Sequence, residues 1–346
     1  MNFLKKFFFL GLFIVQGILF VQLNGQKIKN YEPPVLFDSD SLLELTLKFN
    51  FDSLYNGGIS ETKIYPARLS FDFDDNNFSL KVELTKRGHF RKSFNVCDFP
   101  PLRMNFKRKT TKDTPFENLD KVKLVTHCLT ADTTFEQYVI QEYIVYKAYN
   151  LLTERSFKVR LARITYVDAG KNHPSFIRMA FFIENPEDLA YRIYGKTLDF
   201  HYISPRAVNQ YYYTLMSIFQ YMIINQDWSV NLLHNVELVG IYPSLQPVPV
   251  PFDFDMAGLL NIPYKSPVVA DRKGKLPERK FLPEKTNRKM VDRVVELFKA
   301  KKDDILNLYA NDNYLDSTSK SKIIKRLDEF FAIIENQKLA HKTFLK

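Results

Sequence analysis

Apolar and polar residues alternate through the first quarter of the chain, and this period of two constrains the fold more than any other feature. The alternation places on common faces Leu43, Leu45, Leu47, Phe49 and Phe51, then Leu69, Phe71 and Phe73, and then Phe78, Leu80, Val82 and Leu84. Successive side chains of a strand point to opposite faces, so the pattern predicts an antiparallel β region over about residues 42–86. The turn residues 74–77, Asp-Asp-Asn-Asn, predict a hairpin between its last two strands.

The period changes near residue 133. Residues 133–136, Thr-Thr-Phe-Glu, form a capping box, and the apolar spacing after it predicts one long helix over 135–152. Further strands are predicted at 102–107, 121–127, 157–168, 175–184 and 235–242, and further helices at 186–194, 205–224, 286–309 and 317–337.

This order predicts an α+β fold with two lobes and a hinge near Glu184–Pro186. A β-rich N-lobe with one helix is expected over 26–184, and a mostly helical C-lobe carrying the acidic motifs over 185–346. The C-lobe has two acidic segments, one at Asp227 and one at Asp253 and Asp255. A β-hairpin is expected in the stretch between them.

The N-terminal segment predicts export. Lys5 and Lys6 precede an apolar run at 7–21, and a polar stretch ending at Gly25 follows it. This arrangement is typical of a secretory signal peptide over 1–25, which would deliver the protein to the periplasm or the cell exterior. A membrane anchor is the alternative, but the run is shorter than the roughly 20 residues that a span needs. No later segment predicts a span in the mature chain.

The chain has two cysteines, Cys97 and Cys128, each at the end of a predicted strand. In an oxidising compartment a pair of cysteines favours one disulfide. His89 and His127 suggest a zinc site as the alternative, although the spacing matches no zinc signature.

The formal charge of +10 raises the question of a nucleic-acid partner. The basic residues are scattered along the chain, with small clusters at 107–109 and 299–302. Scattered basic residues are typical of a solvated surface, so we expect no nucleic-acid partner.

Acidic residues interrupt apolar surroundings at two places. Asp227 follows the predicted helix 205–224, and Asp253 and Asp255 alternate with apolar residues after the Pro-rich stretch. Carboxylates two apart in an extended run point to the same side, and hard oxygen ligands suit Mg²⁺ holding a phosphate. The alternative is that Asp227 caps a turn and the Asp pair lies on a solvated loop.

The segments around these acids carry a family resemblance. Over about residues 60–260 the chain resembles the atypical kinase-fold proteins of the spore-coat protein H group. The similar segments, in order, are RGHFRKSF (87–94), PPLRMNF (100–106), LDKVKLV (119–125), the helix with Glu142, RMAFFIENPEDL (178–189), Asp227 with His234-Asn235, and DFDMAG (253–258).

The resemblance implies a two-lobed, atypical protein-kinase-like fold with an ATP site between the lobes. Asp227 would accept or orient the proton of the acceptor hydroxyl, and Asn235 and Asp253 would hold Mg²⁺ on the phosphates, with Asp255 close by. Asn231 is a rival ligand, since Asn235 follows Asp227 by eight residues instead of the usual five.

The same resemblance predicts residues that bind the nucleotide. Arg103 stands where the family has a phosphate-binding lysine, and Lys107 or Lys123 is the alternative cation. Glu142 would pair with that cation. Glu184, before the link between the lobes, completes the predicted nucleotide site.

The predicted function is therefore an exported kinase-like phosphotransferase that uses ATP and Mg²⁺. Its acceptor would be a protein, sugar or lipid of the envelope or a secreted molecule. The alternative is a catalytically inactive kinase-fold module for binding or envelope assembly. A third class, a carbohydrate-active enzyme built on Glu184 and Asp227, has no motif to support it.

Overall fold

The computed structural model describes residues 31–58, 60, 62–88, 97–264 and 277–346. Residues Pro34–Lys346 form one compact unit, which runs through the predicted lobe boundary at 184–185. The predicted signal peptide at 1–25 lies outside the described residues. Within the described ranges, no helix combines the length and the apolar character that crossing a bilayer requires.

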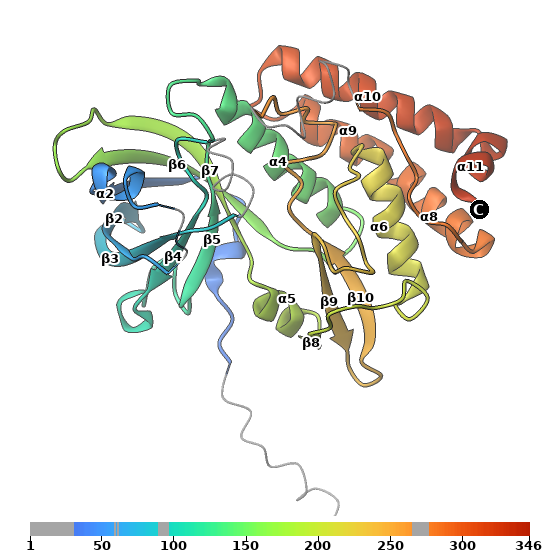
Figure 1. Cartoon of the computed structure of the whole chain (residues 1–346), viewed down its shortest axis with the longest axis horizontal. Coiled ribbons are helices and arrows are strands. Elements are labelled where there is room, and N and C mark those ends of the chain that lie inside the picture. The colour runs from blue at the N-terminus through green and yellow to red at the C-terminus, as the bar shows by residue number, and fades with distance from the viewer. Residues whose placement is uncertain (1–30, 59, 61, 89–96, 265–276) are drawn as a thin grey trace, which may run out of the picture. The chain divides into compact units, whose positions relative to one another are not determined.

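A closed barrel of seven strands forms the first half of the unit (Figure 1). In spatial order its strands are β1 (Leu43–Phe49), β2 (Tyr65–Phe73), β3 (Asn76–Lys86), β4 (Leu102–Phe106), β5 (Lys121–Val125), β7 (Phe176–Ile183) and β6 (Val159–Asp168). Neighbouring strands are antiparallel except β1 and β6, whose parallel pairing from Leu43 opposite Ala162 to Phe49 opposite Asp168 closes the barrel.

The alternating residues fill the barrel interior, as the period of two predicts. The inward side chains of β1, β2 and β3 pack with those of the other strands into one apolar cluster, in which Leu47, Leu69 and Leu84 are completely buried. The predicted hairpin is confirmed: Asp74 and Asp75 link β2 to β3, and both have positive φ, as a two-residue turn between twisted strands requires.

Helix α4 (Thr134–Asn150) covers the outer faces of β6 and β7. Those strands are therefore apolar on both sides: Ala180 and Phe182 point into the barrel, while Phe181 and Ile183 join the core around α4. This placement of the long helix against the β-rich half is the one that the sequence predicts. Short helical segments lie at Val35–Phe37 (η1), Phe51–Tyr55 (α2) and Arg108–Thr110 (η2).

A small second sheet has the order β10 (Gln246–Pro251), β9 (Val236–Ile241) and β8 (Gly195–Thr197). The hairpin predicted between the acidic segments is thus β9–β10. The edge strand β10 tolerates Pro247, Pro249 and Pro251 because they stand at alternate positions, so the missing N–H groups share one side of the strand. Helix α5 (Pro186–Arg192) precedes β8, and α6 (Gln210–Met222) packs on β10.

The C-terminal part consists of the helices α8 (Arg288–Ala300), α9 (Lys302–Ala310), α10 (Ser317–Glu335) and α11 (Gln337–Phe344). The sequence predicted two helices here. Each of them divides, the first at Lys301 and the second at Asn336, whose side chain accepts the N–H of Leu339 and so begins a new helix.

The predicted two-lobed kinase-like fold is wrong. A kinase-like N-lobe is built on an open sheet, whereas this sheet closes on itself through the parallel pairing of β1 with β6. The alternation of apolar residues specifies strands and their buried face, but a barrel and an open sheet give the same alternation. Strands β1 and β6, whose pairing closes the barrel, are more than a hundred residues apart, and no local sequence pattern predicts that they pair.

Candidate functional site

The open end of the β9–β10 hairpin is where the structure gathers most of the predicted site residues. Val236 lies opposite Pro251, and the N–H of Phe252 donates to the carbonyl of Asn235 at 3.1 Å, so the pairing continues one step beyond the strands. Asn235 and Asp253 both have left-handed backbones, with φ of 54° and 60°. These residue types adopt this conformation most readily after glycine, and here they turn both chains at the same end of the hairpin.

Asp227 is bound on both carboxylate oxygens. His234 Nε2 lies 2.9 Å from Asp227 Oδ1, and Asn235 Nδ2 donates to Asp227 Oδ2 at 3.0 Å and to its backbone carbonyl at 2.8 Å. The Asp227 side chain is 42% exposed, so a ligand can reach it. The carboxylate is thus held in a fixed direction at the surface, which is what a group that orients a substrate hydroxyl requires.

A tight loop explains how Asn235 reaches Asp227 across the long interval. Ser229 and His234 exchange two backbone hydrogen bonds of 2.9 Å each, which fold the residues between them into a closed turn. The rival ligand Asn231 lies in this turn and donates to the hydroxyl of Tyr202 at 3.2 Å. Of the two asparagines, Asn235 is therefore the one that contacts Asp227.

The chain that leads to Asp227 is conformationally strained. Ile224, two residues after α6, is buried and has a φ of 59°, which is rare for a β-branched residue. Its carbonyl accepts the N–H of Gly258 at 3.0 Å. A Cβ on Gly258 would lie 2.9 Å from the Ile224 side chain and 2.3 Å from Pro277. Glycine at 258 thus lets the segment after Asp253 dock against the segment before Asp227.

Lys123 is the cationic side chain that interacts electrostatically with Asp253. It lies on the outer face of β5, opposite Arg103 of β4 in the barrel register, with its ammonium 5.2 Å from the centre of the Phe252 ring. Its pKa is lowered to about 8, first by burial and then by the positive charges of Arg87 and Arg103, whereas the carboxylates of Asp253 and Glu237 act in the opposite direction.

The electrostatic balance around Lys123 favours an anion. Three cationic side chains, Arg87, Arg103 and Lys123, influence one another on the outer wall of the barrel. On the facing side, burial raises the pKa of Glu237, and the nearby Lys123 lowers it. An incoming anion would restore part of the solvation that the Lys123 ammonium loses through burial.

Helix α4 contributes Tyr146 as a direct contact. The hydroxyl of Tyr146 accepts the backbone N–H of Asp253 at 2.8 Å. Glu142 lies one turn earlier on the same helix, is buried, and raises the pKa of Tyr146 after the larger effect of burial. The predicted residue Glu142 therefore belongs to the same neighbourhood, and its electrostatic effect on Tyr146 is the link that the structure describes.

Glu184 lies in the link between β7 and α5, and its carboxylate is fully engaged in hydrogen bonds there. Its carboxylate accepts from Arg192 at 2.9 and 2.8 Å and from the backbone N–H of Lys158 at 3.0 Å, and the residue is 3% exposed. This pairing gives Glu184 a structural task, which is to fix the exit of the chain from the barrel.

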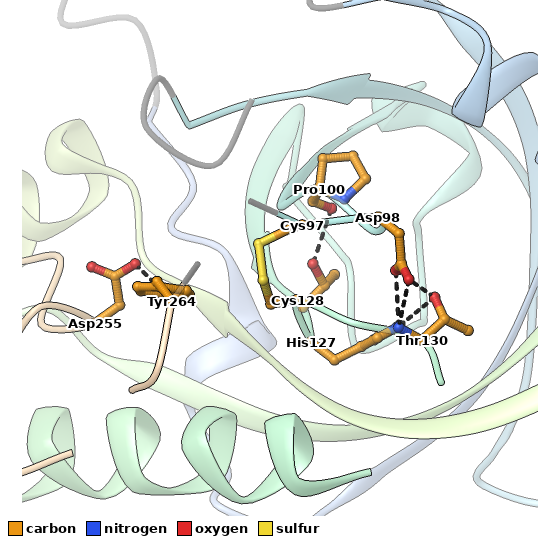
Figure 2. The surroundings of a disulfide bond; sticks show 9 residues. Cys97, Asp98, Pro100, His127, Cys128, Thr130, Asp255 and Tyr264 are labelled. Atoms are coloured by element: carbon orange, nitrogen blue, oxygen red, sulfur yellow. Dashed lines mark hydrogen bonds between the residues drawn. A yellow bond between two sulfur atoms is a disulfide. The ribbon is translucent and has the colours of Figure 1, made fainter. Parts of the chain in front are cut away.

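The predicted disulfide is confirmed. Cys97 and Cys128 are bonded, with their Cα atoms 4.6 Å apart, so the zinc alternative for these sulfurs is excluded (Figure 2). Asp98 accepts the N–H and the hydroxyl of Thr130 beside the bond. Predicted zinc ligand His89 lies outside the described residues.

The disulfide also lies near the acidic segment. Cys128 and Tyr264 line the same small cavity, and the hydroxyl of Tyr264 donates to Asp255 at 2.9 Å (Figure 2). Asp255 is thus directed toward Tyr264. The charge of nearby Asp253 instead acts on Lys123, whose pKa it raises. The sharing of one cation by the two carboxylates stays a prediction.

The donor set for Mg²⁺ consists of few groups. In the part of the chain that the structure describes, no three or more His, Cys, Asp or Glu side chains are grouped as metal ligands. Asn235 donates through its Nδ2 to Asp227, so its Oδ1 is the amide atom that would bind a cation. One carboxylate and one amide oxygen fit Mg²⁺ that arrives with a nucleotide, because this ion is usually held by one or two carboxylates together with substrate phosphates.

Comparison with known proteins gives no relatives: no protein-family model matches the chain, and no curated protein matches it. The resemblance to the spore-coat protein H group therefore remains a prediction.

Sequence reasoning missed three contributors to the site, namely Tyr146, His234 as the partner of Asp227, and Glu237. Tyr146 follows Glu142 by one helical turn, so the helical period placed the two on one face and was a usable signal. The influence of Glu237 on Lys123 depends on the second sheet meeting the barrel, for which the sequence carries no signal.

Proposed function

We propose that the protein is an exported phosphotransferase that uses ATP and Mg²⁺, with Lys123 as the cation that binds the phosphates. The observation that carries this proposal is the position of Lys123, a desolvated ammonium on the barrel wall in the field of Asp253. The proposal does not depend on a kinase fold, because phosphoryl transfer relies on positioning and charge stabilisation that a different scaffold can supply.

Lys123 takes the role that the resemblance gave to Arg103. With a pKa of about 8 it is charged at neutral pH, and burial removes the water that would compete for its proton donors. Arg103 lies beside it in register and adds a second positive charge. An ATP phosphate group is the chemical partner that this wall of cations would bind best.

Asn235 Oδ1 and Asp253 would hold the Mg²⁺, which neutralises charge on the phosphates when it is bound. Both residues are placed by the hairpin end, where Asn235 accepts from Phe252 and Asp253 donates to Tyr146. Asn235 and Asp253 both have left-handed backbones, which turn the chain at the open end of the β9–β10 hairpin.

Asp227 would receive the proton of the acceptor hydroxyl. In the proposed step a bond forms between the acceptor oxygen and the γ-phosphorus, and the bond from that phosphorus to ADP breaks. ADP leaves with the electron pair, and the acceptor proton moves to Asp227. His234 and Asn235 orient the carboxylate for this transfer.

Export is supported by the disulfide and by the N-terminal sequence. Disulfides persist in oxidising compartments, and Cys97–Cys128 is formed. The acceptor would then be a component of the envelope or a secreted molecule.

One observation favours the alternative, a module that binds a phosphorylated ligand without transferring phosphate. Both oxygens of Asp227 already accept hydrogen bonds, which leaves fewer lone pairs for a substrate proton. Such a module would bind ATP and Mg²⁺ but produce no phosphorylated acceptor.

Calorimetric titration of ATP with Mg²⁺ tests the proposal. We expect saturable binding to the wild type and an affinity at least ten times lower for Lys123→Met. Lys121→Met is the matched control, because Lys121 lies on the same face of the same strand and is exposed. No binding to the wild type, or equal losses in both variants, would contradict the proposal. Binding without transfer to any acceptor would select the alternative.

A further inference from the structure

A cavity of about 400 Å³ is lined in part by the loop that follows Asp227. Its wall includes Trp228 and Ser229, the two residues that follow Asp227 in the chain, and also residues from the start of α6 and from the segment 282–285. The volume falls within the range of roughly 300–1,000 Å³ that is typical of small-molecule sites. A ligand in this cavity would lie against the same loop that holds Asp227.

Trp228 is the feature that suggests a ligand. The residue is 8% exposed, and its indole N–H is buried with no hydrogen-bond partner. Trp228 forms part of the wall of the cavity, so a ligand there would contact an aromatic side chain. Tyr213, also mostly buried, adds a second aromatic ring to the same wall.

Polar side chains complete the lining, and they offer both donors and acceptors. Gln210 donates through Nε2 to the carbonyls of Pro205 and Val208, both at 2.8 Å, which fixes its amide and leaves Oε1 as an acceptor. Asn231 and Arg206 line the cavity as donors, and Glu284 as an acceptor. Burial raises the pKa of Tyr213 to about 12, with a further contribution from Glu284, so the phenol remains a neutral hydroxyl.

These features together fit a carbohydrate better than an anion or an extended peptide. A sugar ring has an apolar face of C–H groups, which packs on aromatic rings, and hydroxyls that both donate and accept around its edge. The charged side chains of the lining, Arg206 and Lys285 against Glu284, leave a net charge of only +1, and the Glu284 carboxylate would repel a phosphate. A peptide would call for a groove with backbone partners instead of a ring of side chains.

We propose that the cavity lined by Trp228, Tyr213 and Gln210 binds a sugar unit, and that this sugar is the hydroxyl acceptor presented to Asp227. The second half of this statement rests on the proposed phosphotransferase function, while sugar binding itself does not. The sugar hydroxyl would then be the oxygen that attacks the γ-phosphorus and gives its proton to Asp227.

The single tryptophan of the chain makes the test direct, because Trp228 is its only tryptophan fluorophore. The full chain is titrated with glucose, mannose, galactose and N-acetylglucosamine and with cellobiose, maltose, lactose and chitobiose while the Trp228 emission is recorded. We expect a saturable change with at least one saccharide. Gln210→Ala and Asn231→Ala should weaken it at least tenfold, and Asn105→Ala, which removes an amide from the outer face of β4, should leave it unchanged.

The outcomes separate this inference from the proposed function. No saturable change with any of the saccharides, or binding that Gln210→Ala and Asn231→Ala leave intact, overturns the carbohydrate site. Sugar binding that persists in Lys123→Met supports it whether or not ATP binds. If a sugar binds and ATP with Mg²⁺ does not, the site stands and the phosphotransferase function fails.

Discussion

Two aspartate–histidine pairs, one at the rim of the barrel and one at the hairpin end, show how differently the two regions use the same chemistry. At the rim, Asp52 lies 2.7 Å from His173, and the neighbouring Asp168 accepts four backbone N–H groups, from Phe51, Gly170, Asn172 and His173. These bonds lower the pKa of Asp168 to about 2, with Phe51 the largest cause.

At the hairpin end, Asp227 and His234 form a pair of similar length, 2.9 Å. Its neighbourhood differs from the rim, where the left-handed residue is the exposed Lys171. At the hairpin end the buried, β-branched Ile224 is left-handed together with Asn235 and Asp253, and a partly buried lysine has lost much of its solvation. At the rim, polar groups satisfy the backbone of the chain. At the hairpin end, a β-branched residue has a positive φ and a lysine is partly buried. Such departures from the usual backbone and burial preferences cluster at functional sites.

The largest expected effect is on phosphate transfer, which should depend on the Asp227–His234 pair and not on the Asp52–His173 pair. Replacing Asp227 with Asn keeps the size of the side chain but removes the proton acceptor, so phosphate transfer should fall by about 10²–10⁴-fold while ATP binding stays unchanged. Labelled phosphate incorporation measures this. Asp52→Asn is the matched control at the rim and should leave transfer unaffected. Equal losses in both variants would show that Asp227 has no special role.

The second effect concerns the disulfide, which joins the segment before β4 to the segment after β5. Cys97→Ser combined with Cys128→Ser opens a loop with a sequence separation of 31. Loss of that constraint should reduce the free energy of unfolding by about 3–4 kcal/mol. Chemical denaturation of the oxidised wild type and the double variant measures it. An unchanged unfolding free energy would mean that the bond does not constrain the unfolded chain.

The third effect tests the close packing at the hairpin end. A Cβ at position 258 meets the Ile224 side chain and Pro277, so Gly258→Ala should lower the free energy of unfolding by about 1–3 kcal/mol. It should also weaken ATP binding, because the segment after Asp253 must shift. Denaturation and calorimetry on the same sample measure both. Full stability in the variant would show that the two segments do not dock as described.

The smallest effect is the pH dependence of Lys123. Its pKa is lowered from 10.5 to about 8, so between these values the unfolded chain binds more protons than the folded protein, and stability rises with pH. Below pH 8 the buried charge destabilises the fold. Lys123→Met should therefore be more stable at pH 7 by on the order of 1–2 kcal/mol, and the difference should vanish above about pH 10.5. A difference that grows with pH would contradict this sign.

Sequence patterns predicted the individual strands but not the barrel that they form. The period of two located the strands and their buried faces because each strand of the barrel buries one side in a shared interior. Closure was missed because Leu43 and Ala162 pair across the chain without a local signal. The hairpin between the acidic segments was predicted, but its second strand, β10, lies inside the Pro-rich stretch, which was not predicted to form a strand. Prolines at alternate positions suit an edge strand.

Sequence reasoning brought together Asp227 and Asn235, which do contact each other, whereas it left the choice of cation open. Asp227 and Asn235 do meet, through a turn whose two backbone hydrogen bonds no motif describes. Arg103 and Lys123 could not be ranked from sequence, because their roles depend on burial on the outer wall of the barrel. The positive φ of Ile224 could not be read either, since β-branched residues rarely adopt it.

Thermal and chemical unfolding of wild type and Lys123→Met, each with and without ATP and Mg²⁺, tests the central claim that the buried charge of Lys123 serves an anion. Without ligand, the variant should be the more stable of the two. With ligand at about 100 times its dissociation constant, the wild type should gain about 2.7 kcal/mol, and the variant much less. If the variant is less stable without ligand, or if the ligand stabilises both proteins equally, Lys123 is a structural residue and the account is wrong.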